Sequence, residues 1–151
     1  MTHPQATILI AEDSPDEVFL LRHAFKRSGL TLDLQFVKNG QEAMDYLERK
    51  PPYDDPEKFP FPTALVLDIK MPLVTGLEVL ARLKDDPTLS YIPAVIHSSS
   101  AHENDRAQAA RLGARAYYVK SAHLEDSIAM FRSVAEKFVS IPRRVGPSSM
   151  S

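Results

Sequence analysis

Short apolar runs recur along this chain, and a segment with helical periodicity follows each of them. A short run without alternation is typical of a strand that is buried on both faces, as in a parallel sheet. The run at 32–37 instead alternates apolar and polar residues, which indicates a more exposed strand near one edge. The pattern predicts strands at 6–11, 32–37, 64–67, 93–98 and 116–119, and helices at 15–28, 41–49, 77–84, 103–112 and 123–138.

Strands that alternate with helices in this way form right-handed crossovers, which build a parallel sheet covered by helices on both faces. We therefore expect an α/β fold of the flavodoxin-like, doubly wound type, a (βα)5 three-layer sandwich. The strand order 2-1-3-4-5 fits, because the alternating second strand then lies at an edge. One domain is expected over residues 1–140, and residues 141–151 are expected to form a flexible tail.

Residues 50–62 interrupt the alternation of strands and helices, because they hold five of the chain's twelve prolines. Proline at this density excludes a helix or a central strand. A loop of this length inside a compact domain is often functional. Two interpretations stay open: a partner-binding loop, or a surface loop held in place by its own aromatic residues, Tyr53, Phe59 and Phe61.

Composition narrows the class of protein. The 151 residues suit one domain with a sizeable core, and a net charge of -2 gives no sign of a nucleic-acid surface or a basic membrane patch. The absence of cysteine excludes disulfides, thiolate metal sites and a cysteine nucleophile, and fits a reducing cytosol. The N-terminal sequence lacks the features of a signal peptide, and no apolar stretch is long enough to cross a membrane. We expect a soluble, cytoplasmic protein that binds neither nucleic acid nor membrane.

Polar residues stand where the informative strands end: Glu12-Asp13, Asp68, Ser98 and Lys120. The carboxyl ends of parallel strands meet at one edge of a sheet, which is where open α/β sheets bind their ligands. The first and third strands are neighbours in the expected order, so their carboxylates should converge. Carboxylates packed together repel one another unless a cation neutralises them, and a set of hard oxygen ligands favours Mg2+.

Such a site suits phosphoryl transfer. A carboxylate can attack phosphorus and form an aspartyl phosphate, and Asp68 is the candidate nucleophile. The metal would offset the charge of the incoming group, while the ammonium of Lys120 and the hydroxyl of Ser98 would bind its oxygens. Asp68 could otherwise be a turn or capping residue, and Glu12-Asp13 could serve only the dipole of the following helix.

The motifs ILIAED, LVLDIKMPLVTG, PAVIHSSS and AYYVKS occur together in one family. With them, residues 6–138 closely resemble a response-regulator receiver domain of two-component signalling. The resemblance implies that Asp68 accepts a phosphoryl group from a sensor histidine kinase. It further implies that Asp13 and Asp68 bind Mg2+ directly and that Glu12 acts mainly through metal-bound water. Lys70 would lend its backbone carbonyl to the metal.

The same resemblance assigns the phosphate-binding and switch residues. Ser98 would be the switch hydroxyl, Ser99 would offer a backbone amide, and Lys120 would pair with the phosphate. Tyr117 matches the aromatic residue that moves inward on phosphorylation, with an ordinary core tyrosine as an equal alternative. For His97, which sits beside the site, packing is favoured over a role as a ligand.

Two further positions leave alternatives open. Ser121 follows Lys120 where the family usually has a proline after a cis peptide bond, which leaves the local backbone undecided. The side chain of Lys70 could screen the phosphoryl group from water or extend into solvent.

The proline-rich segment and the lack of an output domain further resemble the stand-alone regulators that pair with phytochrome-type histidine kinases. The resemblance implies a signalling module, not an enzyme, that promotes its own aspartyl phosphorylation and dephosphorylation. It would act through a surface of the fourth helix, fifth strand and fifth helix, including Tyr118 and Ala109-Ala110, which could also form a homodimer. Two other classes stay open: an unphosphorylated receiver-like scaffold and an FMN-binding flavodoxin-like module. An aspartyl phosphatase is disfavoured, because Lys70 stands where a second aspartate would act as the acid.

Overall fold

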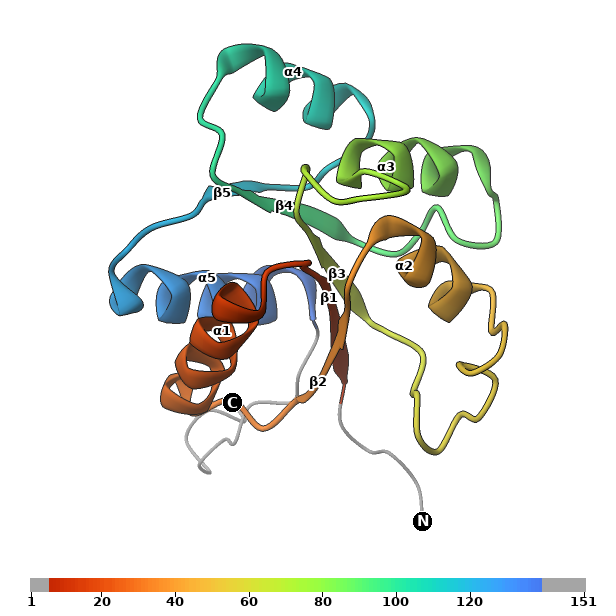
Figure 1. Ribbon diagram of the computed structural model, residues 1–151, viewed down its shortest axis with the longest axis horizontal. Helices are drawn as coiled ribbons and strands as arrows, with labels where there is room; N and C mark the ends of the chain where they lie inside the picture. The colour runs from red at the N-terminus through yellow and green to blue at the C-terminus, as the bar shows by residue number, and fades with distance from the viewer. Residues whose placement is uncertain (1–5, 140–151) are drawn as a thin grey trace, which may run out of the picture.

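The computed structural model describes residues 6–139, which form a parallel five-stranded sheet between two layers of helices (Figure 1). The strands are β1 (Thr7–Ala11), β2 (Asp33–Val37), β3 (Ala64–Leu67), β4 (Ala94–Ser98) and β5 (Tyr117–Val119). The helices are α1 (Pro15–Ser28), α2 (Gly40–Leu47), α3 (Gly76–Asp85), α4 (Glu103–Arg111) and α5 (Leu124–Phe138). The strand order is β2-β1-β3-β4-β5, so the predicted doubly wound fold is confirmed. The predicted tail at 141–151 lies outside the described residues.

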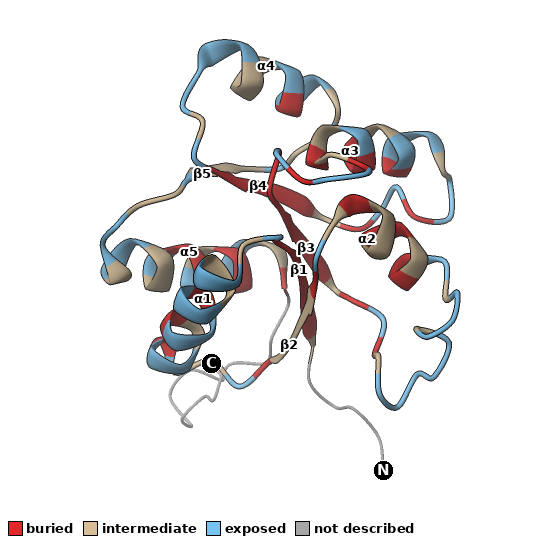
Figure 2. Cartoon of the chain, in the orientation of Figure 1, coloured by how far each residue is buried: buried red, intermediate tan, exposed pale blue. Residues whose placement is uncertain are grey.

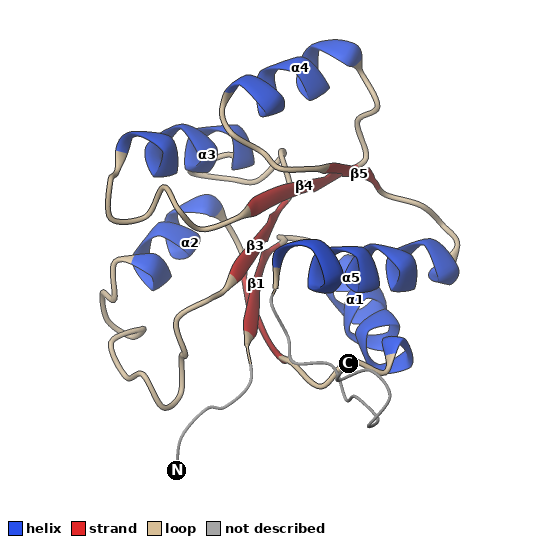
Figure 3. Cartoon of the chain, turned by 180° about the vertical axis from the view of Figure 1, so that it is seen from behind, coloured by secondary structure: helices blue, strands red, loops and turns tan. Residues whose placement is uncertain are grey.

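Two hydrophobic cores, one on each face of the sheet, hold the layers together. Helices α1 and α5 cover one face, where Phe131 packs near Val66 of β3. Helices α2, α3 and α4 cover the other face, where Leu80 packs near Leu67 (Figure 3). Because β1, β3 and β4 are buried on both faces (Figure 2), their sequences are apolar almost throughout. Strand β2 is only partly buried, as its alternating pattern predicted.

Local capping explains where the first helix begins and ends. Ser14 accepts a hydrogen bond from the backbone N–H of Glu17 at 3.3 Å, and Pro15 occupies the first turn, where a helix needs no N–H donor. Gly29 ends the helix in the left-handed conformation, with φ 79°. The predicted bounds of α1 are confirmed.

The other four helices differ from the prediction by one or two residues at their ends: α2 begins one residue early at Gly40, α4 ends one residue early at Arg111, and α5 begins one residue late at Leu124. Helix α3 is one residue longer at each end than predicted; at its start, Thr75 and Glu78 cap each other's backbone N–H groups at 2.8 and 3.2 Å. Helix α2 ends at Leu47 instead of residue 49, because Arg49 takes a positive φ of 59°. None of the helices within residues 6–139 is long and apolar enough to span a lipid bilayer.

Aromatic packing against α2 holds the proline-rich loop, residues 50–62, in place. The ring centroids of Tyr46, Tyr53 and Phe59 are separated by 5.1, 5.8 and 5.0 Å. The buried hydroxyl of Tyr46 donates to the carbonyl of Pro60 at 2.7 Å. The loop leads into the amino end of β3, away from the carboxyl ends of the strands (Figure 1). The interpretation of a loop held by its own aromatic residues is confirmed for Tyr53 and Phe59, and a partner-binding role stays a prediction.

Candidate functional site

Strands β1 and β3 bring two predicted acidic residues together. Ala11 pairs with Leu67 across the two strands, so Glu12 and Asp68, the next residue of each, lie side by side. The backbone N–H of Asp68 donates to the carbonyl of Ala11 at 3.2 Å, which continues the ladder to the strand ends. The sheet register therefore fixes the spacing of the two carboxylates.

The carboxylates of Glu12, Asp13 and Asp68 form one cluster. An oxygen from each lies within 4.8 Å of the others. Glu12 and Asp68 are only 2% and 6% exposed, whereas Asp13 faces solvent. Burial raises the pKa of Glu12, against the lowering effect of hydrogen bonds from Lys120 and from the N–H of Ser14. This set of oxygen ligands, with one side open to water, fits a small hard cation such as Mg2+.

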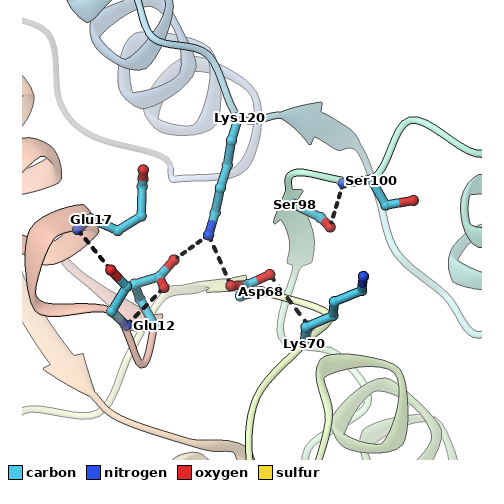
Figure 4. Close-up of polar contacts among 8 residues, drawn as sticks. Glu12, Glu17, Asp68, Lys70, Ser98, Ser100 and Lys120 are labelled. Atoms are coloured by element: carbon cyan, nitrogen blue, oxygen red, sulfur yellow. Dashed lines mark hydrogen bonds and ion pairs between the residues drawn. The ribbon is translucent and has the colours of Figure 1, made fainter.

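Lys120 bridges two of these carboxylates (Figure 4). Its Nζ lies 2.8 Å from Oε1 of Glu12 and 2.9 Å from Oδ2 of Asp68. Burial alone would lower the pKa of Lys120, but the hydrogen bonds to Glu12 and Asp68 raise it overall, so the side chain is an ammonium at neutral pH. Its backbone N–H donates to the carbonyl of Ser98 at 2.8 Å. The predicted lysine thus reaches the predicted phosphoacceptor directly.

Close backbone packing fixes the loop after Asp68. A Cβ at position 76 would lie 2.1 Å from the carbonyl oxygen of Asp68, so only glycine fits there. The N–H of Gly76 donates to the carbonyl of Ile69 at 3.0 Å, and the N–H of Lys70 lies 3.4 Å from Oδ1 of Asp68. The side chain of Lys70 is exposed, as expected if it extends into solvent. Its carbonyl as a metal ligand stays a prediction.

Ser100, which the sequence analysis did not single out, connects the candidate switch residues. Its N–H donates to Oγ of the buried Ser98 at 3.1 Å, and its carbonyl accepts from the hydroxyl of Tyr117 at 2.8 Å. Its own hydroxyl donates to Asp105 of α4 at 2.5 Å. Arg106 of the same helix lies over the ring of Tyr117, 4.8 Å from the centroid. Tyr117 is therefore connected to Ser100 and to α4, and its role as a switch stays a prediction.

The peptide bond after Lys120 is trans, whereas the family usually has a cis bond to proline at this position. Within residues 6–139 the cis bond joins Pro51 to Pro52, so the bond between Lys120 and Ser121 is trans. The hydroxyl of Ser121 donates to Asp126 at 2.6 Å and accepts from the N–H of His123 at 3.0 Å. The serine therefore orders the start of α5 through side-chain hydrogen bonds.

Two other predicted residues lie close to the site. Ser99 is exposed, and its backbone amide as a phosphate ligand stays a prediction. His97 is 4% exposed, and this burial, together with the charge of Lys120, lowers its pKa to about 4. Its imidazole is therefore neutral at pH 7.

The proposed interaction face needs a correction. Tyr118 is not a free surface residue, because it packs against the core under α1 and α5 and its hydroxyl bonds to that of Ser133 at 2.8 Å. Ala109 is buried at 1% exposure. Ala110 is exposed, as is Val119 at 38%. Of the residues predicted for this face, Ala110 is exposed and Tyr118 is partly exposed, whereas Ala109 is buried; the face itself stays a prediction.

The fold, together with the cluster of Glu12, Asp13 and Asp68, is typical of one family of proteins. Residues 8–132 match the response regulator receiver domain. The chain therefore belongs to the family of response regulator receiver domains.

Within this family, the chain is similar to several phytochrome-associated response regulators. The response regulator Rcp1 of Synechocystis sp. is 32% identical over 133 residues, which cover 88% of both chains. Among solved structures, the phosphorylated cyanobacterial phytochrome response regulator RcpA is 31% identical, with a TM-score of 0.79 over 92% of this chain and 99% of its own. The Mn2+-bound form of Rcp1 is 30% identical, with a TM-score of 0.76 over 91% of this chain and 99% of its own. The likeness thus extends over nearly the full length of small, single-domain regulators.

Proposed function

We propose that this protein is a phosphorylation-controlled response regulator in which Asp68 accepts a phosphoryl group from the phosphohistidine of a sensor kinase. The observation that carries the proposal is the position of Lys120, whose Nζ lies within 2.9 Å of the Asp68 carboxylate, beside the cluster of three carboxylates. An attacking carboxylate, a cation for the phosphoryl oxygens and a metal-binding acid pair are the parts that phosphoryl transfer to aspartate needs.

In the proposed step, a carboxylate oxygen of Asp68 attacks phosphorus in line with the leaving imidazole. The P–N bond of the phosphohistidine breaks, an O–P bond to Asp68 forms, and the imidazole keeps the electron pair of the broken bond. Asp13, Asp68 and Glu12 would hold Mg2+, which when bound supplies positive charge for the phosphoryl oxygens. The ammonium of Lys120 would then shift from the Asp68 carboxylate to the phosphoryl group.

The switch follows from the contacts of Ser98. Its hydroxyl accepts the N–H of Ser100 at 3.1 Å, and we propose that it turns to donate to the new phosphoryl group. The loop that carries Ser100 would follow, and Tyr117 and α4 would change with it, because both are bonded to Ser100. The exposed face around Ala110 and Val119 is the proposed site of a homodimer or of a target protein.

A phytochrome-type histidine kinase is the proposed partner. Two facts support it: the similarity to RcpA, described as a phytochrome response regulator, covers 99% of that chain, and the similarity to Rcp1 covers 88% of that protein. A cytoplasmic location goes with this partner, because the kinase delivers its phosphoryl group there.

The test is incubation with Mg2+ and acetyl phosphate, followed by intact-mass spectrometry. Wild-type protein should gain the mass of one phosphoryl group, and chelation of Mg2+ should prevent this. Asp68→Asn should remove the modification, whereas Asp16→Asn, which removes an exposed carboxylate from the first turn of α1, should not. Undiminished labelling of Asp68→Asn would exclude Asp68 as the acceptor, and a protein that is never labelled would be the receiver-like scaffold instead.

A further inference from the structure

A second group of potential metal ligands lies beside the acidic cluster, on the side of the sheet that faces α1. One ligand atom each from Glu12, Glu17 and His97 lies within 4.8 Å of the other two. The three residues come from different elements: Glu12 follows β1, Glu17 is in the first turn of α1, and His97 is in β4. Figure 4 shows Glu17 on the side of Glu12 that lies away from Asp68. The group thus shares Glu12 with the cluster that includes Asp13 and Asp68, but its other two ligands, Glu17 and His97, do not belong to that cluster.

The chemistry of this group differs from that of the cluster. It offers an imidazole nitrogen with two carboxylates, and imidazole suits Zn2+ and related transition metals, whereas Mg2+ prefers oxygen ligands alone. We propose that Glu12, Glu17 and His97 form a site for a transition-metal cation, for which Zn2+ is the representative. No part of this assignment needs the phosphoryl-transfer function.

The three side chains lie close enough to reach a common ion after a modest movement. Ligand atoms about 2.1 Å from a tetrahedral Zn2+ stand about 3.4 Å apart, whereas those of Glu12, Glu17 and His97 lie within 4.8 Å of one another, so they have to approach by at most about 1.4 Å. Glu12 and His97 are 2% and 4% exposed and held by the sheet. Glu17 is half-exposed on a helix surface, so its side chain can make this adjustment and leaves a path for the ion.

Occupation of the site changes the contacts of Lys120. Oε2 of Glu12 accepts the N–H of Ser14 at 3.1 Å, and Oε1 is paired with the ammonium of Lys120 at 2.8 Å. A cation held by Glu12 repels the ammonium of Lys120 on the same carboxylate and weakens that contact. Lys120 then depends more on its contact with Asp68. By the same repulsion, the ion opposes a second divalent cation at the neighbouring cluster, with which it shares Glu12.

The binding test uses the full chain, freed of metal and titrated with Zn2+ in competition with a chromophoric chelator. Glu17→Gln and His97→Phe should each weaken Zn2+ binding at least about tenfold, since each removes a direct ligand. Asp16→Asn and Asp13→Asn should leave the affinity unchanged, because neither carboxylate belongs to the group. Co2+ bound to the wild-type chain should show visible ligand-field bands that His97→Phe alters.

Two results would overturn the assignment. One is a Zn2+ affinity that is the same in Glu17→Gln and His97→Phe as in the wild-type chain. The other is an affinity that falls only in Asp13→Asn, which would place the ion in the acidic cluster. Circular dichroism of His97→Phe separates loss of a ligand from loss of the fold, and Glu17→Gln changes no buried group.

The regulatory consequence rests on the proposed function and has its own measurement. Zn2+ should slow the Mg2+-dependent labelling of the wild-type chain by acetyl phosphate, and should slow labelling of Glu17→Gln at least about tenfold less effectively. If the chain binds Zn2+ through Glu17 and His97 but is never labelled, the proposed function fails and the metal site stands. If it is labelled but Zn2+ slows the wild-type chain and Glu17→Gln equally, the site fails and the function stands.

Discussion

Lys120 stands between two buried carboxylates, so its removal leaves like charges facing one another. Its Nζ contacts Glu12 at 2.8 Å and Asp68 at 2.9 Å, and its side chain is only 15% exposed. We expect Lys120→Met to lower the free energy of unfolding by about 2 kcal/mol in the presence of a chelator, below the full cost of breaking a buried pair because water reaches the site. Urea unfolding at neutral pH measures this loss.

Mg2+ tests whether repulsion between the carboxylates causes the loss of stability in Lys120→Met. In Lys120→Met the metal should recover more stability than it adds to the wild-type chain, because it neutralises carboxylates that have lost their partner. An equal gain in both proteins would mean that Lys120 does not compensate the cluster. Lys58→Met, at an exposed lysine of the proline-rich loop away from the cluster, should change neither quantity by more than about 0.5 kcal/mol.

His97 makes stability depend on pH. Burial lowers its pKa from 6.5 to about 4, so between these values the unfolded chain binds a proton that the folded chain does not. Stability from this group is complete above pH 6.5 and is lost as the pH falls towards 4, in total about 3 kcal/mol. His97→Phe should therefore lose less stability than the wild-type chain between pH 7 and pH 4.5. Parallel pH profiles from urea unfolding, with a chelator present, would contradict this.

At the residue scale, the sequence predicts a functional side chain best when the strand carries it. Asp68 and Lys120 could be assigned because each follows the last residue of a parallel strand, and the sheet order then determines where they meet. Ser100 could not, because its role depends on contacts with Tyr117 of β5 and Asp105 of α4, which no local sequence pattern predicts. A hydroxyl two residues after a strand gives no local signal for such contacts.

At the scale of elements, the burial of a tyrosine is determined by its tertiary contacts and not by the local sequence pattern. The prolines predicted that residues 50–62 form neither helix nor strand, and the structure confirms this. The buried Tyr46 was not assigned to the core, because its hydroxyl is satisfied by the carbonyl of Pro60, fourteen residues away. Nothing in the α2 pattern separates a tyrosine with such a partner from an exposed one. The same reason explains why the partial burial of Tyr118 against the core under α5 was not expected.

The start of α3 gives the prediction for an element. A Cβ at position 76 would lie 2.1 Å from the carbonyl oxygen of Asp68, so Gly76→Ala must push the loop away from the site. We expect a loss of about 1–3 kcal/mol in the free energy of unfolding, and slower labelling by acetyl phosphate in the protein that remains folded. Labelling at wild-type rate would show that the loop position does not matter for the reaction.

Gly113→Ala is the control that separates a general loss of stability from a displacement of the loop next to Asp68. A Cβ there meets open space, but φ is +99°, so alanine is strained by about 1 kcal/mol or more. This variant should lose stability to a similar extent without any change in labelling. Residue 113 lies between α4 and the start of β5, at the amino ends of the strands, whereas Asp68 lies at their carboxyl ends. If both variants label slowly, loss of stability alone explains the effect at Gly76.

At the scale of the whole molecule, the sheet does more than position the acids. The carboxyl ends of β1 and β3 hold the proposed phosphoacceptor, while the next strands lead to Ser98 and Tyr117. A change at the acids can therefore reach α4 across two strands. One such connection passes through Ser100, which contacts Ser98, Tyr117 and Asp105.

Ser100→Ala tests this connection without touching the acids. It removes the hydroxyl that bonds to Asp105 at 2.5 Å but keeps the backbone groups that contact Ser98 and Tyr117. A hydrogen bond to a carboxylate stabilises by more than about 1 kcal/mol, so the first-turn amides of α4 should exchange with solvent about tenfold faster. Hydrogen exchange read by mass spectrometry measures this in the unphosphorylated chain. Ser99→Ala, at the exposed neighbour, should not change it. Equal exchange in both variants would mean that α4 is held by other contacts, and that a signal from Ser98 must reach it through Tyr117 and Arg106 instead.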